Sequence, residues 1–214
     1  QFEECFIVSR IARRLSSVAI AVLMCATSPA LADEAVFGAG SFRAMEPVFD
    51  EVRGVTKTEP GYAGGVSANP NHKNAEDNGH IEVVRVTFDP KLVPYEHLLE
   101  VFWANVDPVD EEGQFCDEGA RFTPVIFTMD DEQDRLAKIA SQRVQENYLN
   151  WQEVHVAIRR LNEFYPAESE FQDYYKKSKM GYKFYNFRCG RERRLSDLWD
   201  GVDSLNLFSE ATVR

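Results

Sequence analysis

This sequence has fewer basic than acidic residues, few cysteines and no phosphate-binding glycine motif. The 214 residues include 24 Lys and Arg against 35 Asp and Glu, for a formal net charge of -11. Nucleic-acid binding needs clustered Lys and Arg, so this balance argues against nucleic acid as a partner. The four cysteines are too few for a disulfide scaffold, and neither they nor the four histidines have zinc-like spacing. No glycine loop has Walker or Rossmann spacing, so we expect neither a metal nor a nucleotide cofactor.

The first 32 residues are expected to be a signal peptide. Three arginines precede an apolar stretch at 18–26 that is too short to span a bilayer, and Ala30-Leu-Ala32 has the form of a cleavage site. A start at Val8 would give a well-formed signal peptide, which places residues 1–7 upstream of the expected start. We therefore expect an exported protein, in a bacterial periplasm, without a stable membrane anchor.

Residues 33–214 are predicted to form one domain, because they contain no internal repeat, low-complexity run or long linker. This part of the chain has 21 basic and 33 acidic residues, a net charge of -12. It keeps only two cysteines, Cys116 and Cys189, which an oxidising compartment would allow to pair.

Hydrophobic periodicity predicts an α/β (α+β) fold. The order strand–helix–strand–strand–helix–strand is typical of a ferredoxin-like split βαβ sandwich. The C-terminal region after the last predicted helix is expected to be mostly irregular. Predicted strands are 35–37, 55–65, 81–88, 122–128 and 154–158, and predicted helices are 42–52, 95–105, 130–148 and 168–177.

Ser41 lies in the segment Gly38-Ala-Gly-Ser-Phe42, where a predicted strand ends and a helix begins. The free N–H groups and the dipole at a helix N-terminus favour negative charge. A cysteine there would have a lowered thiol pKa, whereas a serine hydroxyl needs an adjacent base to act as a nucleophile. The other interpretation is that Ser41 is simply an N-cap residue.

Two acidic residues are further candidates. Glu82 begins the strand 81–88, whose even positions share one face that is otherwise apolar. A carboxyl at the rim of such a face loses hydration and can stay protonated, which suits a proton donor; the alternative is a glutamate that points to solvent. Asp117 follows Cys116 on a predicted turn before a strand. Without the family resemblance, this segment indicates only a loop with a capping aspartate.

Ordered blocks between Ala35 and Trp199 resemble the A-type peptide methionine sulfoxide reductases. Their number and spacing make the resemblance specific, and it implies the same α/β sandwich. The blocks are Met45-Glu-Pro47, Gly61-Tyr-Ala-Gly-Gly65, Asn69-Pro70, the segment 79–86, the segment 98–103, Asn105-Val-Asp-Pro108, the segment 113–117, the segment 164–168 and Cys189-Gly-Arg191.

The resemblance implies an oxidoreductase that repairs methionine S-sulfoxide, in proteins or free, under oxidative stress. A cysteine attacks the sulfoxide sulfur, a glutamate protonates the oxygen, and a second cysteine resolves the sulfenic acid. Thioredoxin or another dithiol then reduces the disulfide, and no other cofactor is implied. Mapped by motif, Ser41 stands at the nucleophile position, Glu82 is the proton donor, Asp117 orients the site and Cys189 is the candidate resolving residue.

The substrate-binding positions implied by the resemblance are Phe42, Arg43, His72, His80 and Phe122. Several of these depart from the family pattern. Arg43 replaces the tryptophan that flanks the substrate methyl group, and His72 and Phe122 replace tyrosines. With Ser41 these make four changes. A fifth is Phe171, which replaces a histidine after the Pro-Ala-Glu block.

Three functions follow from these departures. The first is a reductase with little or no turnover, because a hydroxyl cannot form the sulfenic acid that the cycle needs; Cys116 could then act as a rescuing thiol. The second is a non-catalytic module that binds peptides containing oxidised methionine. The third is a structural relic stabilised by a Cys116–Cys189 disulfide.

Overall fold

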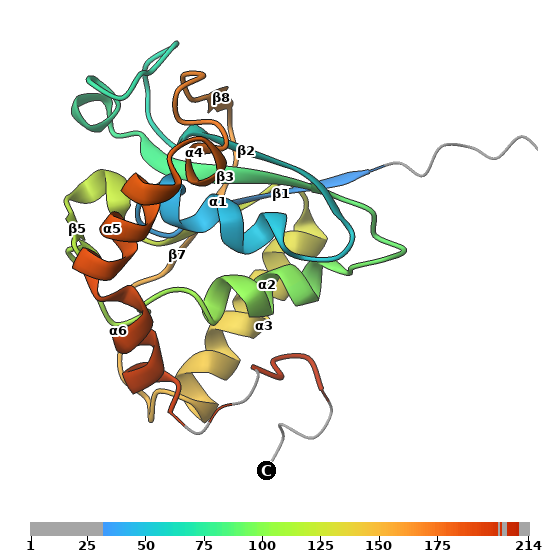
Figure 1. The fold of residues 1–214 in the computed structure, drawn as a ribbon. Coiled ribbons are helices and arrows are strands. Elements are labelled where there is room, and N and C mark those ends of the chain that lie inside the picture. Colours follow the sequence, from blue (N-terminus) through green and yellow to red (C-terminus); the bar gives the residue numbers. More distant parts are fainter. Residues whose placement is uncertain (1–31, 201, 203–204, 210–214) are drawn as a thin grey trace, which may run out of the picture. The chain divides into compact units, whose positions relative to one another are not determined.

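The structure, a computed structural model, describes residues 32–200, 202 and 205–209 (Figure 1). The predicted signal peptide, apart from Ala32, lies outside these residues. Within the described part of the chain, none of the helices combines the length and apolar character needed to cross a bilayer.

A six-stranded sheet forms the centre of the domain, and its strands lie in the order β7-β6-β1-β3-β2-β8 (Figure 1). Strand β3 lies between β1 and β2 and is antiparallel to both, and β6 is antiparallel to β1. The mixed α/β class is therefore confirmed, with a split βαβ unit at its centre. The strands are β1 (Asp33–Gly38), β2 (Val55–Ala63), β3 (Ile81–Phe88), β6 (Val125–Thr128), β7 (Ala157–Arg160) and β8 (Phe164–Pro166).

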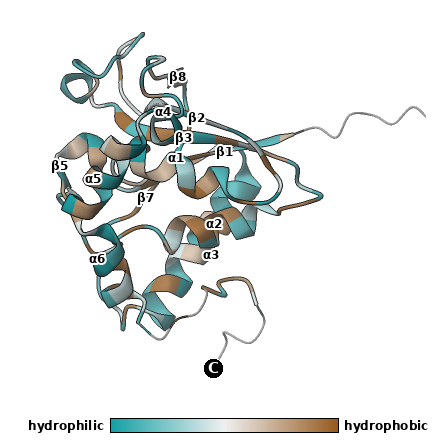
Figure 2. Ribbon diagram, in the orientation of Figure 1, coloured by the Kyte–Doolittle hydropathy of each residue, from teal (hydrophilic) through white to brown (hydrophobic). Residues whose placement is uncertain are grey.

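The helices α1 (Phe42–Asp50), α2 (Tyr95–Trp103) and α3 (Asp131–Asn147) share one hydrophobic core with the sheet. Their apolar residues lie at helical spacing, and Figure 2 shows apolar residues along α2. The even positions of β3 after Glu82 face this core, as the alternation predicted, while the odd positions Ile81 and Val83 belong to a second, smaller cluster. The core face of β3 therefore begins at Glu82.

The C-terminal region is helical, so the prediction of an irregular segment is wrong. It contains α4 (Tyr174–Lys177), α5 (Lys179–Cys189) and α6 (Arg191–Leu198). The apolar residues Met180, Phe184 and Phe187 of α5 are exposed, and α6 is largely hydrophilic (Figure 2). Neither helix shows a strong core-facing stripe, which is why periodicity did not predict them.

Other predicted boundaries also needed correction. The helix predicted at 168–177 is helical only from Tyr174, because Asp173 before it adopts a left-handed backbone with φ of 53°. The strand predicted at 122–128 begins at Val125, after the short 3-10 helix η2 (Ala120–Phe122). The strand predicted at 154–158 is shifted to β7, where it pairs in parallel with β6. Segments between the predicted strands and helices also contain short elements, namely η1 (Glu76–Asn78), β4 (Gly113–Gln114) and β5 (Asp117–Glu118).

Two buried charged side chains connect the C-terminal region to α1. Arg191 donates hydrogen bonds to the carbonyl oxygens of Ala44 and Asn105, at 3.0 and 2.8 Å. Glu46 accepts one from the backbone N–H of Asp173 at 2.8 Å, and its second carboxyl oxygen has no partner among the described residues. Burial raises the pKa of Glu46 to about 7, although the hydrogen bond from Asp173 opposes that shift.

The buried Glu46 should make stability depend on pH. Because its folded-state pKa is raised, its contribution is fully present below the ordinary value of 4.5 and is lost as pH rises through about 7. Glu46→Gln keeps an acceptor for Asp173 and stays neutral, so at pH 8.5 it should be more stable than the parent by on the order of 2 kcal/mol. At pH 5 the two should differ little.

Thermal unfolding at both pH values measures this effect. The exposed neighbour Glu51 gives a matched control, since Glu51→Gln should change stability by no more than about 0.5 kcal/mol at either pH. An equal difference between the Glu46 variant and the parent at both pH values would contradict the assignment.

Candidate active site

Ser41 begins α1 and also belongs to a buried polar cluster. Its Oγ accepts a hydrogen bond from the Arg43 N–H at 3.4 Å, so the N-cap interpretation is confirmed. The same oxygen donates to Oε2 of Glu82 at 3.1 Å. Gly40 before it has φ of 78°, and a Cβ there would lie 2.8 Å from Cβ of Gln114, so glycine is required for this turn. Ser41 therefore combines a capping role with contact to a buried carboxylate.

Glu82 is 1% exposed, which excludes the solvent-facing alternative. Its Oε2 also accepts a hydrogen bond from the backbone N–H of Phe42, at 3.2 Å. Oε2 of Glu82 thus accepts hydrogen bonds from the N-terminus of α1, whereas Oε1 has other neighbours.

Asp117, on β5, is a further neighbour of Ser41. Burial raises the pKa of Asp117, while hydrogen bonds from the Tyr185 hydroxyl and from the Ser41 backbone N–H lower it, for a net increase. Burial, together with the nearby Asp117, also raises the pKa of Tyr185. Ser41, Glu82 and Asp117, which are far apart in sequence, are therefore neighbours in space.

Oε1 of Glu82 faces two nitrogen atoms. His72 Nδ1 lies 3.6 Å away and Arg121 Nε lies 3.9 Å away. Arg121 also donates from Nη1 to the carbonyl oxygen of His72 at 3.1 Å. The backbone N–H of His72 donates to Glu168 at 2.9 Å, and Glu168 accepts a further bond from Tyr62. The loop that carries His72 is thus fixed from both sides.

Aromatic rings line the same region. The Phe171 ring packs on Phe42 at 5.4 Å and on His72 at 4.8 Å between centroids. The Arg43 guanidinium lies over Phe171 at 5.0 Å and over Tyr174 at 5.3 Å. Phe171 therefore supplies an apolar surface against Phe42 and Arg43, the two residues that follow Ser41.

Two predicted substrate-binding residues have other partners. The ring nitrogens of His80 lie within hydrogen-bonding distance of Gly65 N and of the Ser67 carbonyl oxygen, so the buried His80 supports the loop before η1. The Phe122 ring lies under the Arg121 guanidinium at 4.5 Å. Phe122 thus holds Arg121 in place and has no group that could donate a hydrogen bond.

Cys116 and Cys189 form a disulfide, with 4.8 Å between their Cα atoms. Cys116 is exposed and directly precedes Asp117, and Cys189 ends α5 one turn after Tyr185. Neither cysteine is a free thiol in this structure. The predicted resolving residue, Cys189, is therefore bonded to Cys116, the predicted rescuing thiol, so neither has a free thiol group.

Sequence reasoning missed Arg121 and Tyr185. Arg121 directly precedes the predicted Phe122, and Tyr185 is one helical turn before the predicted Cys189. Their closeness to candidate residues was the only signal. Arg121 lies outside the predicted strands and helices, and the segment that forms α5 and carries Tyr185 was predicted as irregular. Their contacts depend on tertiary structure that periodicity does not describe.

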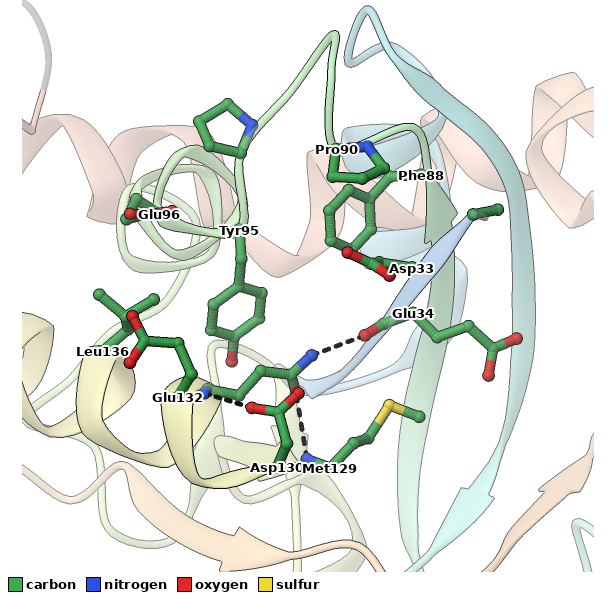
Figure 3. A pocket seen from close by; sticks show the side chains of 13 residues that line it. Asp33, Glu34, Phe88, Pro90, Tyr95, Glu96, Met129, Asp130, Glu132 and Leu136 are labelled. Atoms are coloured by element: carbon green, nitrogen blue, oxygen red, sulfur yellow. Dashed lines mark hydrogen bonds between the residues drawn. The ribbon is translucent and has the colours of Figure 1, made fainter. Parts of the chain in front are cut away.

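A separate hollow of about 500 Å³ lies at the opposite end of β1 from Ser41 (Figure 3). Tyr95, Glu96 and Leu136 line it together with the first residues of β1. Gln133 also lines it and donates a hydrogen bond to the Glu34 carbonyl oxygen at 2.8 Å. This hollow contains none of the residues around Ser41.

Comparisons with known proteins identify the family of this chain. A family model described as peptide methionine sulfoxide reductase matches residues 33–202. A peptide methionine sulfoxide reductase MsrA of Bacillus pumilus is 39% identical over 167 residues, which is 77% of this chain and 94% of that protein.

Two solved structures are similar to the fold. Reduced Mxr1 of Saccharomyces cerevisiae has a TM-score of 0.65 and 25% identity, covering 72% of this chain and 90% of that one. Methionine sulfoxide reductase A of Corynebacterium diphtheriae has a TM-score of 0.62 and 25% identity, covering 72% and 78%.

The fold and these matches define an oxidoreductase class that acts on oxidised sulfur. The chain belongs to the peptide methionine sulfoxide reductase family, and its curated relatives are A-type enzymes.

Proposed function

We propose that this chain has the substrate and site of a peptide-methionine (S)-sulfoxide reductase, with Ser41 at the nucleophile position and with turnover almost abolished. The observation that carries the proposal is the 3.1 Å contact between Ser41 Oγ and Glu82 Oε2 at the start of α1. The assigned roles are nucleophile position for Ser41, proton donor for Glu82 and orientation for Asp117.

The proposed loss of turnover follows from electron balance. Reducing a sulfoxide to a sulfide removes one oxygen atom and requires two electrons and two protons. A thiolate sulfur supplies the electron pair and becomes a sulfenic acid, which a second thiol reduces with release of water. A serine oxygen has no corresponding stable oxidised state, so Ser41 can hold a position in the site but cannot start the cycle.

A second candidate function is a binding module for peptides with oxidised methionine. The Ser41–Glu82 contact favours it, because a buried and hydrogen-bonded site is kept although the reactive atom is missing. The partners proposed are methionine-sulfoxide peptides and, for any redox step, a thioredoxin-like dithiol. The N-terminal sequence supports export to a periplasm.

Titration of the full chain with three matched peptides tests the proposal. The peptides contain methionine S-sulfoxide, methionine R-sulfoxide or unoxidised methionine. We expect the S-sulfoxide peptide to bind at least about tenfold more tightly than the unoxidised peptide, as one to two hydrogen bonds to the oxygen would give. Incubation with dithiothreitol should leave the bound sulfoxide unreduced. Equal binding of all three peptides would contradict the proposal.

A further inference from the structure

Two nitrogen atoms beside Glu82 have no hydrogen-bond acceptor among the described residues. They are His72 Nδ1 and Arg121 Nε, and both are buried. Their distances to Glu82 Oε1, 3.6 and 3.9 Å, are too long for hydrogen bonds. A buried N–H without an acceptor costs about 1–3 kcal/mol, so such groups in a native protein call for an explanation.

Both side chains are held in place by other contacts. Arg121 donates from Nη1 to the His72 carbonyl oxygen, lies over the Phe122 ring, and has Nε 3.9 Å from Glu76 Oε2. His72 is fixed through its backbone bond to Glu168 and its packing on Phe171. These contacts fix the two side chains with His72 Nδ1 and Arg121 Nε at 3.6 and 3.9 Å from Glu82 Oε1, which suits a preorganised binding site.

A sulfoxide oxygen fits this arrangement. It carries partial negative charge and accepts hydrogen bonds without donating any, so two N–H groups suit it, while an unoxidised methionine sulfur is only a weak acceptor. His72 donates from Nδ1 in the tautomer that protonates this nitrogen. The ring of Phe171 packs on both His72 and Phe42, so these two phenylalanines provide an apolar surface for the methyl group of the substrate.

We propose that Arg121, together with His72, binds the sulfoxide oxygen and sets the preference for oxidised over unoxidised methionine. Phe122 has no hydroxyl with which to donate, and the adjacent Arg121 supplies the missing donor. The two oxygens of Glu82 then have separate tasks, since Oε2 contacts Ser41 and Oε1 faces the bound oxygen. The inference rests on the function proposed above, because it takes the sulfoxide group as the ligand.

The test compares peptide binding by the full chain and by two variants. Arg121→Met keeps an aliphatic side chain over Phe122, and His72→Phe keeps an aromatic ring against Phe171. Each variant should lower affinity for the S-sulfoxide peptide about tenfold and leave affinity for the unoxidised peptide unchanged. The measured quantity is the ratio of the two dissociation constants.

Arg85→Met is the matched control. Arg85 is on β3, three residues from Glu82, lies over the Phe164 ring at 4.3 Å and pairs with Glu59. Its loss removes an ion pair and a cation–aromatic contact outside the site, so the ratio should not change. Thermal unfolding checks that each variant folds, and His72→Phe tests the donor pair independently if Arg121→Met does not fold.

The outcomes separate this inference from the proposed function. If the parent chain itself shows no preference for the sulfoxide peptide, the proposed function fails. If the parent prefers it and neither variant changes the ratio, the function stands and the role of Arg121 and His72 is overturned. An equal loss of affinity for both peptides would also overturn it, because that result indicates a structural role.

Discussion

Ser41→Cys is expected to convert the chain into a working reductase, with a rate at least about 100-fold above that of the parent. The new sulfur would lie where the N-terminus of α1 lowers the pKa of a thiol and favours the thiolate. Glu82 Oε2, 3.1 Å from the present hydroxyl oxygen, would be within reach of the reacting atoms. Dithiothreitol would reduce the sulfenic acid directly. The measurement is chromatographic separation of peptides containing methionine and methionine S-sulfoxide after incubation with dithiothreitol.

Two comparisons make this result specific. The R-sulfoxide peptide should remain unreduced by the Ser41→Cys variant, because the site positions one epimer. Adding Glu82→Gln to this variant should lower the rate by about 100-fold, the usual size of a lost general acid. If the parent reduces the S-sulfoxide peptide as fast as Ser41→Cys does, the assignment of Ser41 to the nucleophile position is wrong.

Loss of the Cys116–Cys189 disulfide is expected to lower the free energy of unfolding by about 4 kcal/mol. The bond joins residues 73 apart in sequence, so its removal frees a long loop in the unfolded chain. It also releases the end of α5, which carries the Tyr185 hydroxyl to Asp117. The double variant Cys116→Ser/Cys189→Ser should therefore unfold at lower urea concentration than the parent.

Urea unfolding followed by circular dichroism measures this difference. The matched control is Cys5→Ser/Cys25→Ser, which removes the two cysteines of the predicted signal peptide and should leave the unfolding midpoint unchanged. A loss of less than about 1 kcal/mol in the Cys116→Ser/Cys189→Ser variant would show that the bond contributes little to stability.

Segments with a regular hydrophobic period were predictable from sequence. Strand β3 has the predicted bounds, because its alternation is regular and its even positions face the core. Alternation and the glycine turn singled out Glu82 and Ser41 separately, and only the family resemblance placed the two residues in one site. α5 and α6 were not predictable in the same way, since their apolar residues are few or exposed.

The charged parts of the site depended on tertiary structure. Arg121 lies in η2, a short 3-10 helix that was not predicted, and only the folded chain brings it to His72 and Glu82. The sequence permitted Cys116 and Cys189 to pair but could not require it, because local pattern does not encode the distance between the β4–β5 turn and the end of α5. The same applies to Tyr185, whose partner Asp117 is 68 residues away.

The Cys116–Cys189 bond also limits the electrons that residues 33–200 can deliver by themselves. Both cysteines of this segment are already oxidised, so it holds no free thiol that could supply reducing equivalents. A Ser41→Cys variant in this oxidised state would reduce one methionine sulfoxide per molecule and would then need an external thiol before it could react again. Dependence on an external reductant would thus begin with the very first catalytic cycle.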